Sequence, residues 1–342
     1  MTTEPVEQPP GPVSAWFRRL FGAVYDALVS ALDSVFARIQ SLVGTRRVPY
    51  LFILPNLLIF GIFILGPMLL NFVYAFTGGD SFLPQERTFV GAENFAQLLE
   101  CEDFLDPNTC REDLFWRAVF NTTGYVAGQV SLMVAVSLFT ALILNRKLHL
   151  RTFFRSVYFY PVLLSPIVVA LIWKWILQEN GVLNGLLVAL GMAKMPFLVD
   201  ASWARFWVVI ISVWSTMGFY TLILLAGLQS IPAELYEAAK IDGANSWQSF
   251  RRITLPLLMP TLLVVLVLSL IRAVQVFDVV FAFTGGGPGT ATLYLVQYIY
   301  DNGFSSPNKQ YGLAAGASLL MAGTLVVLTL IQLRLNREEH TA

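Results

Sequence analysis

The amino-acid sequence predicts an all-α, polytopic membrane protein with six transmembrane helices and one helical loop outside the membrane. Of its 342 residues, 56% are hydrophobic and 13% are charged, whereas soluble domains carry roughly a quarter charged residues. Six apolar stretches are long enough to cross a bilayer, since about 20 apolar helical residues span its hydrocarbon core. The stretch Ser230–Pro256 is the longest charged interruption after residue 120, and its composition favours a position outside the membrane.

The first 47 residues precede the apolar stretches and divide into two parts. Residues 1–12 are polar and rich in proline, without the apolar core or cleavage site of a signal peptide, so we expect a disordered tail. In residues 13–47, apolar side chains recur at helical spacing, but arginine and aspartate interrupt them too often for a spanning helix. This pattern predicts an amphipathic helix on the cytoplasmic membrane surface or against a partner.

The transmembrane domain is expected at residues 48–335, followed by a short cytoplasmic tail at residues 336–342. Several prolines fall inside the spans, which membrane helices tolerate where neighbouring groups or water satisfy the freed carbonyls. The six predicted spans are Leu51–Phe76, Arg117–Leu144, Phe153–Leu177, Ala204–Leu228, Leu257–Phe283 and Tyr311–Leu333.

Lysine and arginine residues predict the orientation of these spans. With the N-terminus inside, 14 of the 22 basic residues lie in cytoplasmic segments and six in outer segments, and short cytoplasmic loops of membrane proteins carry this excess. We therefore expect both termini and the stretch Ser230–Pro256 in the cytoplasm. The 14 residues are Arg18, Arg19, Arg38, Arg46, Arg47, Arg146, Lys147, Arg151, Arg155, Lys240, Arg251, Arg252, Arg334 and Arg337.

The first outer loop, at about residues 78–116, is strongly acidic and suits contact with a soluble partner. It also contains Cys101 and Cys110, the two cysteines of the chain. On the oxidising side of the membrane, two cysteines in one short loop favour a structural disulfide, with two unpaired thiols as the alternative.

Polar side chains inside the predicted spans are candidates for a substrate path, because polar groups at membrane depth are costly. Arg272 and Asp278 lie on the fifth predicted span about 240° apart on a helical wheel, which disfavours a simple pair between them. With Gln275 they either line a water-filled path or form hydrogen bonds between helices. Aromatic faces and hydroxyl partners would suit a sugar. The remaining candidates are Gln129, Ser131, Trp214, Thr216 and Tyr220.

Several activities lack the residues that they require. There is no G-x-x-x-x-G-K-[ST] phosphate loop, and the glycine-rich stretch Gly285–Gly289 lacks its lysine, so we expect no ATP hydrolysis by this chain and no bound cofactor. Two cysteines and two histidines are too few for the usual zinc clusters, and they assemble no catalytic set. A formal net charge of zero gives no electrostatic reason to expect nucleic acid.

The stretch Ser230–Pro256, here the 230–256 loop, carries signals for two short helices. We expect Ser230 to cap a first helix with Pro232 in its first turn, and Gly243 to end it. Asn245 and Gln248 have the spacing of a capping box for a second helix. The loop is therefore predicted as helix, glycine turn and helix.

The same loop resembles the E-A-A loop of binding-protein-dependent ABC importer permeases, of the type I class. The matching residues are Glu237, Ala238, Ala239, Asp242, Gly243, Ala244, Trp247, Phe250, Ile253, Leu255 and Pro256. In that family this loop forms a coupling helix that docks into a separate ATPase subunit. The resemblance implies that Glu237 to Ala239 and Asp242 to Ala244 couple the chain to such an ATPase.

A second motif is similar to the first permease subunit of carbohydrate importers of the maltose and glycerol-3-phosphate type. It comprises residues 283–289, followed by Ala291-Thr292 and by Tyr311-Gly312 at the start of the last span. The resemblance covers roughly residues 50–335. The amphipathic segment and the acidic loop with its cysteines lie outside it, and the large outer domain of the maltose protein has no counterpart here.

The resemblance implies a non-enzymatic permease subunit of an ATP-driven importer for a sugar or sugar derivative, in a bacterial inner membrane. Its implied partners are a second permease, a dimer of ATPase subunits that binds ATP and magnesium, and an extracytoplasmic solute-binding protein. Two alternatives stay open. One is a polyol, glycerol phosphate, amino acid or other small solute as cargo; the other is a membrane enzyme or an ion-coupled carrier that uses Arg272 and Asp278.

Overall fold

The computed structural model describes residues 46–146 and 151–339, with five isolated positions before them, residues 22, 29, 30, 40 and 44. The predicted tail at residues 1–12 and nearly all of the predicted amphipathic helix therefore lie outside the described residues. The chain divides into two units, residues 1–70 and 71–342. Each unit is described by itself.

The first unit contains the start of the first membrane span. Helix α2 (Val48–Phe60) begins with Pro49 in its first turn, where a missing N–H leaves no bond unmade, and carries Pro55 inside. A π-helical turn, Gly61–Leu65, continues into α3 (Gly66–Ala75), so the helical path from Tyr50 to Ala75 is long and apolar enough to span a membrane.

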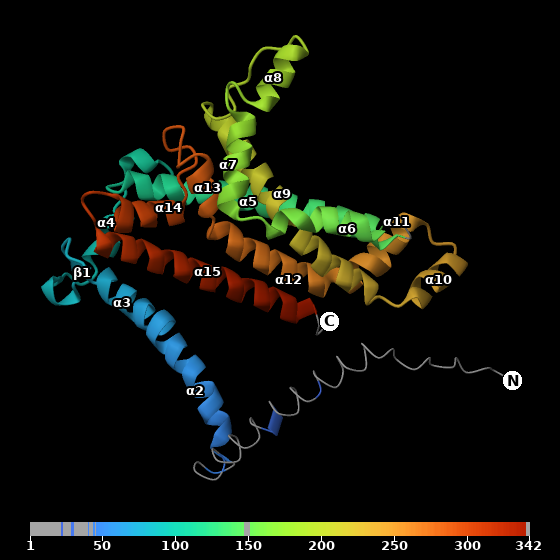
Figure 1. Cartoon of the computed structure of the whole chain (residues 1–342), viewed down its shortest axis with the longest axis horizontal. Helices are drawn as coiled ribbons and strands as arrows, with labels where there is room; N and C mark the ends of the chain where they lie inside the picture. The colour runs from blue at the N-terminus through green and yellow to red at the C-terminus, as the bar shows by residue number, and fades with distance from the viewer. Residues whose placement is uncertain are drawn as a thin grey trace. The chain divides into compact units, whose positions relative to one another are not determined.

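The second unit is a helical bundle (Figure 1). Helix α9 packs along α5, and α12 lies against both. Within the described residues, five helices are long and apolar enough to cross a membrane, and a bent pair of helices brings the number to six. The all-α, six-span fold is therefore confirmed. The remaining long helices are α5 (Asp113–Asn145), α9 (Ala201–Gln229), α12 (Leu255–Val274) and α15 (Tyr311–Glu339).

The third predicted span is broken rather than straight. Its two halves, Phe153–Leu163 and Pro166–Ala189, meet at 97°. The residue before Pro166 is extended, with φ −60° and ψ 132° at Ser165, because the proline ring disfavours the helical conformation there. The helices concerned are α6 (Arg151–Phe159), the 3₁₀ turn Tyr160–Leu163, α7 (Pro166–Leu177) and α8 (Val182–Ala189).

The fifth span is shorter than predicted, and this changes the place of Asp278. Helix α12 ends at Val274, and the chain then turns before α13 (Asp278–Phe283) begins. No proline or glycine marks the break in the sequence. Helix α13 instead packs against α7, so tertiary contacts redirect residues whose apolar pattern alone would continue the helix.

The last span also differs from its prediction at the C-terminal end. Helix α15 continues to Glu339, so it includes part of the tail that was expected at residues 336–342. The side chains of that last turn are not described.

A small cap of short elements covers the end of the bundle where α5 begins. A disulfide joins Cys101 to Cys110 in the loop before α5. The buried guanidinium of Arg87 donates hydrogen bonds to Thr77 Oγ1 and to the carbonyls of Thr77, Gly79 and Ser81, which fixes the preceding turn. The elements of the cap are β1 (Thr77–Gly78), paired antiparallel with β2 (Thr88–Phe89), α4 (Glu93–Leu99) and α14 (Leu295–Tyr300).

Candidate functional site

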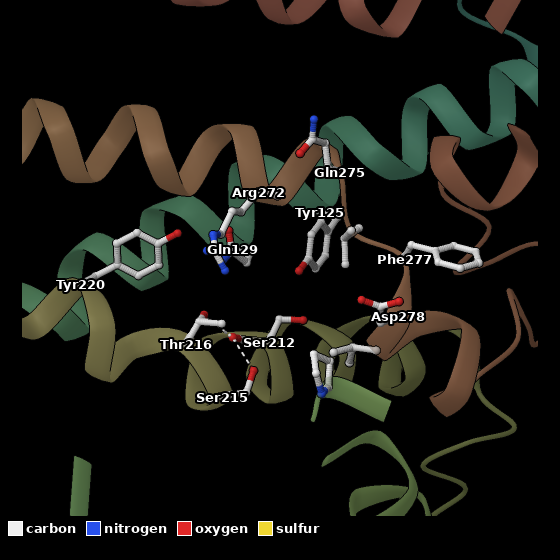
Figure 2. A pocket seen from close by; sticks show the side chains of 14 residues that line it. Tyr125, Gln129, Ser212, Ser215, Thr216, Tyr220, Arg272, Gln275, Phe277 and Asp278 are labelled. Carbon is white, nitrogen blue, oxygen red and sulfur yellow. Dashed lines mark hydrogen bonds between the residues drawn. The ribbon is translucent and has the colours of Figure 1, made fainter. Parts of the chain in front are cut away.

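A polar cavity of about 410 Å³ lies between α5, α9 and the break that follows α12 (Figure 2). It opens among membrane spans that are otherwise apolar, so its polar lining stands out against its surroundings. The lining residues are Tyr125, Gln129, Pro166, Ser212, Ser215, Thr216, Tyr220, Arg272, Ala273, Gln275, Val276, Phe277, Asp278 and Val279.

Two helices present their polar residues to the cavity through regular spacing. Tyr125 and Gln129 are four residues apart on α5, and Ser212, Thr216 and Tyr220 follow at the same interval on α9. Residues four apart lie on one face of a helix. Each helix therefore contributes a polar stripe to the cavity.

The hydroxyl and amide groups of these stripes keep hydrogen-bonding capacity for a ligand. Thr216 Oγ1 donates to the carbonyl of Ser212 at 2.7 Å, and Ser215 Oγ donates to the same carbonyl at 3.1 Å. Both hydroxyl oxygens remain able to accept a hydrogen bond. Gln129 is 5% exposed, and its Oε1 has no partner among the described residues. A buried acceptor without a partner costs about 1–3 kcal/mol, so a ligand or water that donates to it would be favoured.

Arg272 and Asp278 reach into the cavity from the two sides of the break after α12 (Figure 2). The guanidinium carbon of Arg272 lies 5.7 Å from the ring centroid of Phe219. Among the described residues, neither side chain forms a salt bridge. A ligand in the cavity therefore meets both a cation that only donates hydrogen bonds and a carboxylate that only accepts them.

The structure brings six of the eight candidate path residues into this one cavity. Gln129, Thr216, Tyr220, Arg272, Gln275 and Asp278 all line it. Ser131 is exposed and does not line it. Trp214 packs edge-on against Trp173, with ring centroids 5.7 Å apart.

Sequence reasoning missed Tyr125, Ser212 and Phe277, which also line the cavity. The first two carried a usable signal, the four-residue spacing from Gln129 and from Thr216. Phe277 carried none, because its position depends on the break after α12.

The 230–256 loop folds as two short helices with well-defined ends. Helix α10 (Ala233–Ile241) has Pro232 as its N-cap; the expected cap, Ser230, instead ends α9 and donates to the carbonyl of Gly227. Ser230 keeps helical dihedral angles, φ −80° and ψ −12°, whereas Pro232 has a non-helical ψ of 132°, so the helix begins after Pro232 although this residue supplies no side-chain cap.

Gly243 ends α10 as predicted. Its φ is +76°, a left-handed conformation that glycine adopts without penalty. The N–H of Ala244 donates to Ala239 O at 2.9 Å and that of Gly243 to Lys240 O at 3.2 Å, which is the Schellman pattern. Helix α11 (Ser246–Ser249) then starts with the predicted capping box, in which Asn245 and Gln248 exchange side-chain and backbone hydrogen bonds.

Helix α10 has two different faces. Leu235, Ala238 and Ile241 are exposed, with Ile241 at 86%. On the other face, the Tyr236 hydroxyl lies 3.0 Å from Thr254 Oγ1 and holds α10 to the start of the fifth span. Of the six predicted coupling residues, Glu237, Ala238, Asp242 and Gly243 are exposed, whereas Ala239 and Ala244 are half-buried.

No group of three or more histidine, cysteine, aspartate or glutamate residues suited to a metal ion occurs within the described residues.

The chain matches one family model and many known proteins. Residues 133–338 match the model of the binding-protein-dependent transport system inner membrane component. The trehalose/maltose transport system permease protein MalF of Thermococcus litoralis is 36% identical over 294 residues, covering 85% of this chain and 94% of that protein. The arabinooligosaccharides transport system permease protein AraP of Bacillus subtilis is 35% identical over 295 residues, covering 85% and 89% respectively.

Solved structures show the same fold. A chain of a bacterial ABC transporter involved in the import of the acidic polysaccharide alginate matches with a TM-score of 0.74 and 26% identity, covering 88% of this chain and 99% of that chain. A chain from the alginate transporter in complex with an alginate pentasaccharide-bound periplasmic protein matches with a TM-score of 0.71 and 26% identity, covering 88% and 98%.

Proposed function

We propose that this chain, which belongs to the family of binding-protein-dependent transport system inner membrane components, is the permease subunit of an ATP-driven ABC importer for a sugar or sugar derivative. The names of the relatives described above give trehalose or maltose, arabinooligosaccharides and alginate as their cargoes. These cargoes differ in size and charge but share a carbohydrate backbone. The class of substrate is therefore better supported than any one sugar.

The polar cavity is the observation that carries this proposal. A sugar presents many hydroxyls that donate and accept hydrogen bonds, together with apolar ring faces. Arg272 supplies donors, Asp278 supplies acceptors, and the tyrosines Tyr125 and Tyr220 also line the same 410 Å³ space. Such a polar lining would admit a sugar between spans that are otherwise apolar.

The exposed face of α10 suits a separate ATPase as its partner. Leu235, Ala238 and Ile241 place apolar side chains in solvent, and exposed apolar patches mark interaction surfaces. Tyr236 and Thr254 tie this helix to the span α12. ATP-driven closure of an ATPase pair, with ATP and magnesium bound there, would thus move α10 and rock the spans between inward-facing and outward-facing states.

A second permease and an extracytoplasmic solute-binding protein complete the proposed assembly. The chain would provide half of the path, and the binding protein would deliver the sugar to the cap end of the bundle. The alginate transporter complex with a periplasmic protein supports the second partner. The excess of lysine and arginine supports cytoplasmic termini and a cytoplasmic 230–256 loop.

The test is uptake by a host strain that lacks this gene, complemented with the wild-type chain or with Asp278→Asn. We expect the wild type to restore ATP-dependent uptake of at least one sugar from a labelled panel, and Asp278→Asn to lower it. A thermal-shift screen of the cognate binding protein against sugars, polyols, glycerol phosphate and amino acids identifies the cargo. Uptake driven by a proton gradient without ATP would instead establish the ion-coupled carrier.

A further inference from the structure

A second cavity, of about 760 Å³, lies behind the 230–256 loop. It sits where membrane spans end, since Asn145 is the last residue of α5, Arg146 is its C-cap, and Leu228 belongs to the last turn of α9. The apolar runs of both spans end here, at Leu144 and Leu228, and lipid headgroups lie where the apolar part of a span ends.

The charged residues that line this cavity are both cations, and they lie among neutral polar side chains. Arg146 from the end of α5 and Lys240 from α10 both line it, and its described lining contains no aspartate or glutamate. Within the part of the chain that the structure describes, neither cation forms a salt bridge or a side-chain hydrogen bond. Two cations without counter-charges in one cavity favour an anionic ligand.

Beside its polar groups, the cavity has an apolar and aromatic part. Leu142 and Leu228 line it from the spans, and Trp247 stacks on Phe250 with ring centroids 5.6 Å apart. Trp247 is 66% exposed. Tryptophan is enriched at the level of lipid headgroups, because its ring is apolar and its N–H is polar. A small hydrophilic anion would use none of these apolar contacts.

We propose that this cavity binds the headgroup of an anionic phospholipid. The lipid phosphate lies between Arg146 and Lys240, and the upper part of an acyl chain follows Leu142 and Leu228. Basic pockets between membrane helices bind such headgroups, because nearby cations attract the phosphate. A free phosphate shares the charge, but it has no use for the apolar half of the site.

The bound lipid would join α10 to the end of α5 without blocking the ATPase. Tyr236 and Lys240, four residues apart, line the cavity, whereas the exposed residues Leu235, Ala238 and Ile241 do not line it and lie on another face of α10. The headgroup is thus a second support for the loop, beside the Tyr236–Thr254 hydrogen bond. This inference rests on the cavity and does not depend on the transported substrate.

The test is native mass spectrometry of the purified full-length chain with phosphatidylglycerol or phosphatidylcholine of identical acyl chains. We expect the wild type to bind phosphatidylglycerol about tenfold more tightly, and the double variant Arg146→Gln/Lys240→Gln to lose most of this preference. The matched control is Arg251→Gln/Arg252→Gln, which removes two exposed cations of the same loop that do not line the cavity. The control should keep the preference.

The conservative variant Arg146→Lys/Lys240→Arg should also keep the preference, which separates loss of charge from misfolding. Equal affinity of the wild type for both lipids would overturn the proposal. An equal loss of the preference for phosphatidylglycerol in the Arg251→Gln/Arg252→Gln control would also overturn it, because general attraction between basic loops and anionic lipids would then explain the preference. Displacement of phosphatidylglycerol by millimolar inorganic phosphate would assign the site to a free anion instead.

Discussion

The polar cavity and the 230–256 loop lie in the same bundle, and they are assembled from the sequence in different ways. The loop is one continuous stretch whose turn, caps and exposed face follow from neighbouring residues. The cavity gathers residues from position 125 to position 279 on several elements (Figures 1 and 2). A surface that acts on a partner can be built locally, whereas a buried polar site requires the packing of distant helices.

This difference predicts two kinds of variant. Changes in the loop should disconnect ATP hydrolysis from transport while the bundle stays folded. Changes in the cavity should alter the recognition or passage of the cargo while the loop still engages its ATPase. The following experiments test that separation.

The largest effect is expected from Gly243→Pro. Proline cannot adopt the φ of +76° and removes the N–H that donates to Lys240 O. A cost of about 3 kcal/mol at this turn corresponds to at least about a 100-fold loss of uptake. Uptake and membrane insertion are both measured, and insertion should be normal. Gly243→Asn is the control. Asparagine tolerates the left-handed region, so this variant should retain most of the uptake. Normal uptake by the proline variant would refute the coupling role of the loop.

Removal of either charge from the cavity should have the next largest effect. Arg272→Gln and Asp278→Asn each weaken charged hydrogen bonds to the cargo, which are worth about 1.5–3 kcal/mol and thus about 10–100-fold in uptake efficiency. ATPase activity of the purified assembly without cargo should stay close to that of the wild type. Ser131→Ala serves as the control, because Ser131 is exposed and does not line the cavity. Unchanged uptake in both charge variants would place the substrate path elsewhere.

A charge on the exposed face of α10 should weaken docking of the ATPase more moderately. Ile241→Glu puts a carboxylate where an 86% exposed isoleucine offers apolar contact, and we expect about a tenfold lower affinity in a titration with the ATPase subunit. Val199→Glu is the matched control, because Val199 is 77% exposed and precedes the first turn of α9, at the opposite end from the loop. Similar losses in both variants would mean that the α10 face is not the docking surface.

The smallest effect on transport is expected from the cap, which belongs to neither site. Cys101→Ser/Cys110→Ser opens a disulfide with a sequence separation of nine residues, and the loss of this constraint costs the local hairpin about 2–3 kcal/mol. Limited trypsin digestion should cut more rapidly after Arg111, while uptake changes by less than about twofold. A loss of uptake as large as that of the cavity variants would extend the functional region to the cap.

Much of the fold and of the loop could be predicted from the sequence because the responsible forces act over short distances. Composition and the length of apolar runs predicted six spans, and the comparisons and the structure confirm the fold and the permease family. The capping box at Asn245 and the turn at Gly243 were also predicted, since their hydrogen bonds join residues within five positions of each other. The prediction for Ser230 was wrong because this residue continues the helical turn at the end of α9, and the chain leaves the helical conformation only at Pro232.

Only the tertiary structure decided where the cavity lies and which residues share it. Apolar periodicity continued the fifth span to Phe283, but the packing of α13 on α7 ended it at Val274 and placed Asp278 opposite Arg272. Pro166 signals a bend in the third span locally, but the angle of 97° follows only from the packing of the bundle. Local hydrogen bonds and hydrophobic transfer depend on residue type and near neighbours, so the sequence by itself determined the number of spans and the turn and caps of the loop. The cavity depends on contacts between helices far apart in the chain, which form only when the bundle packs.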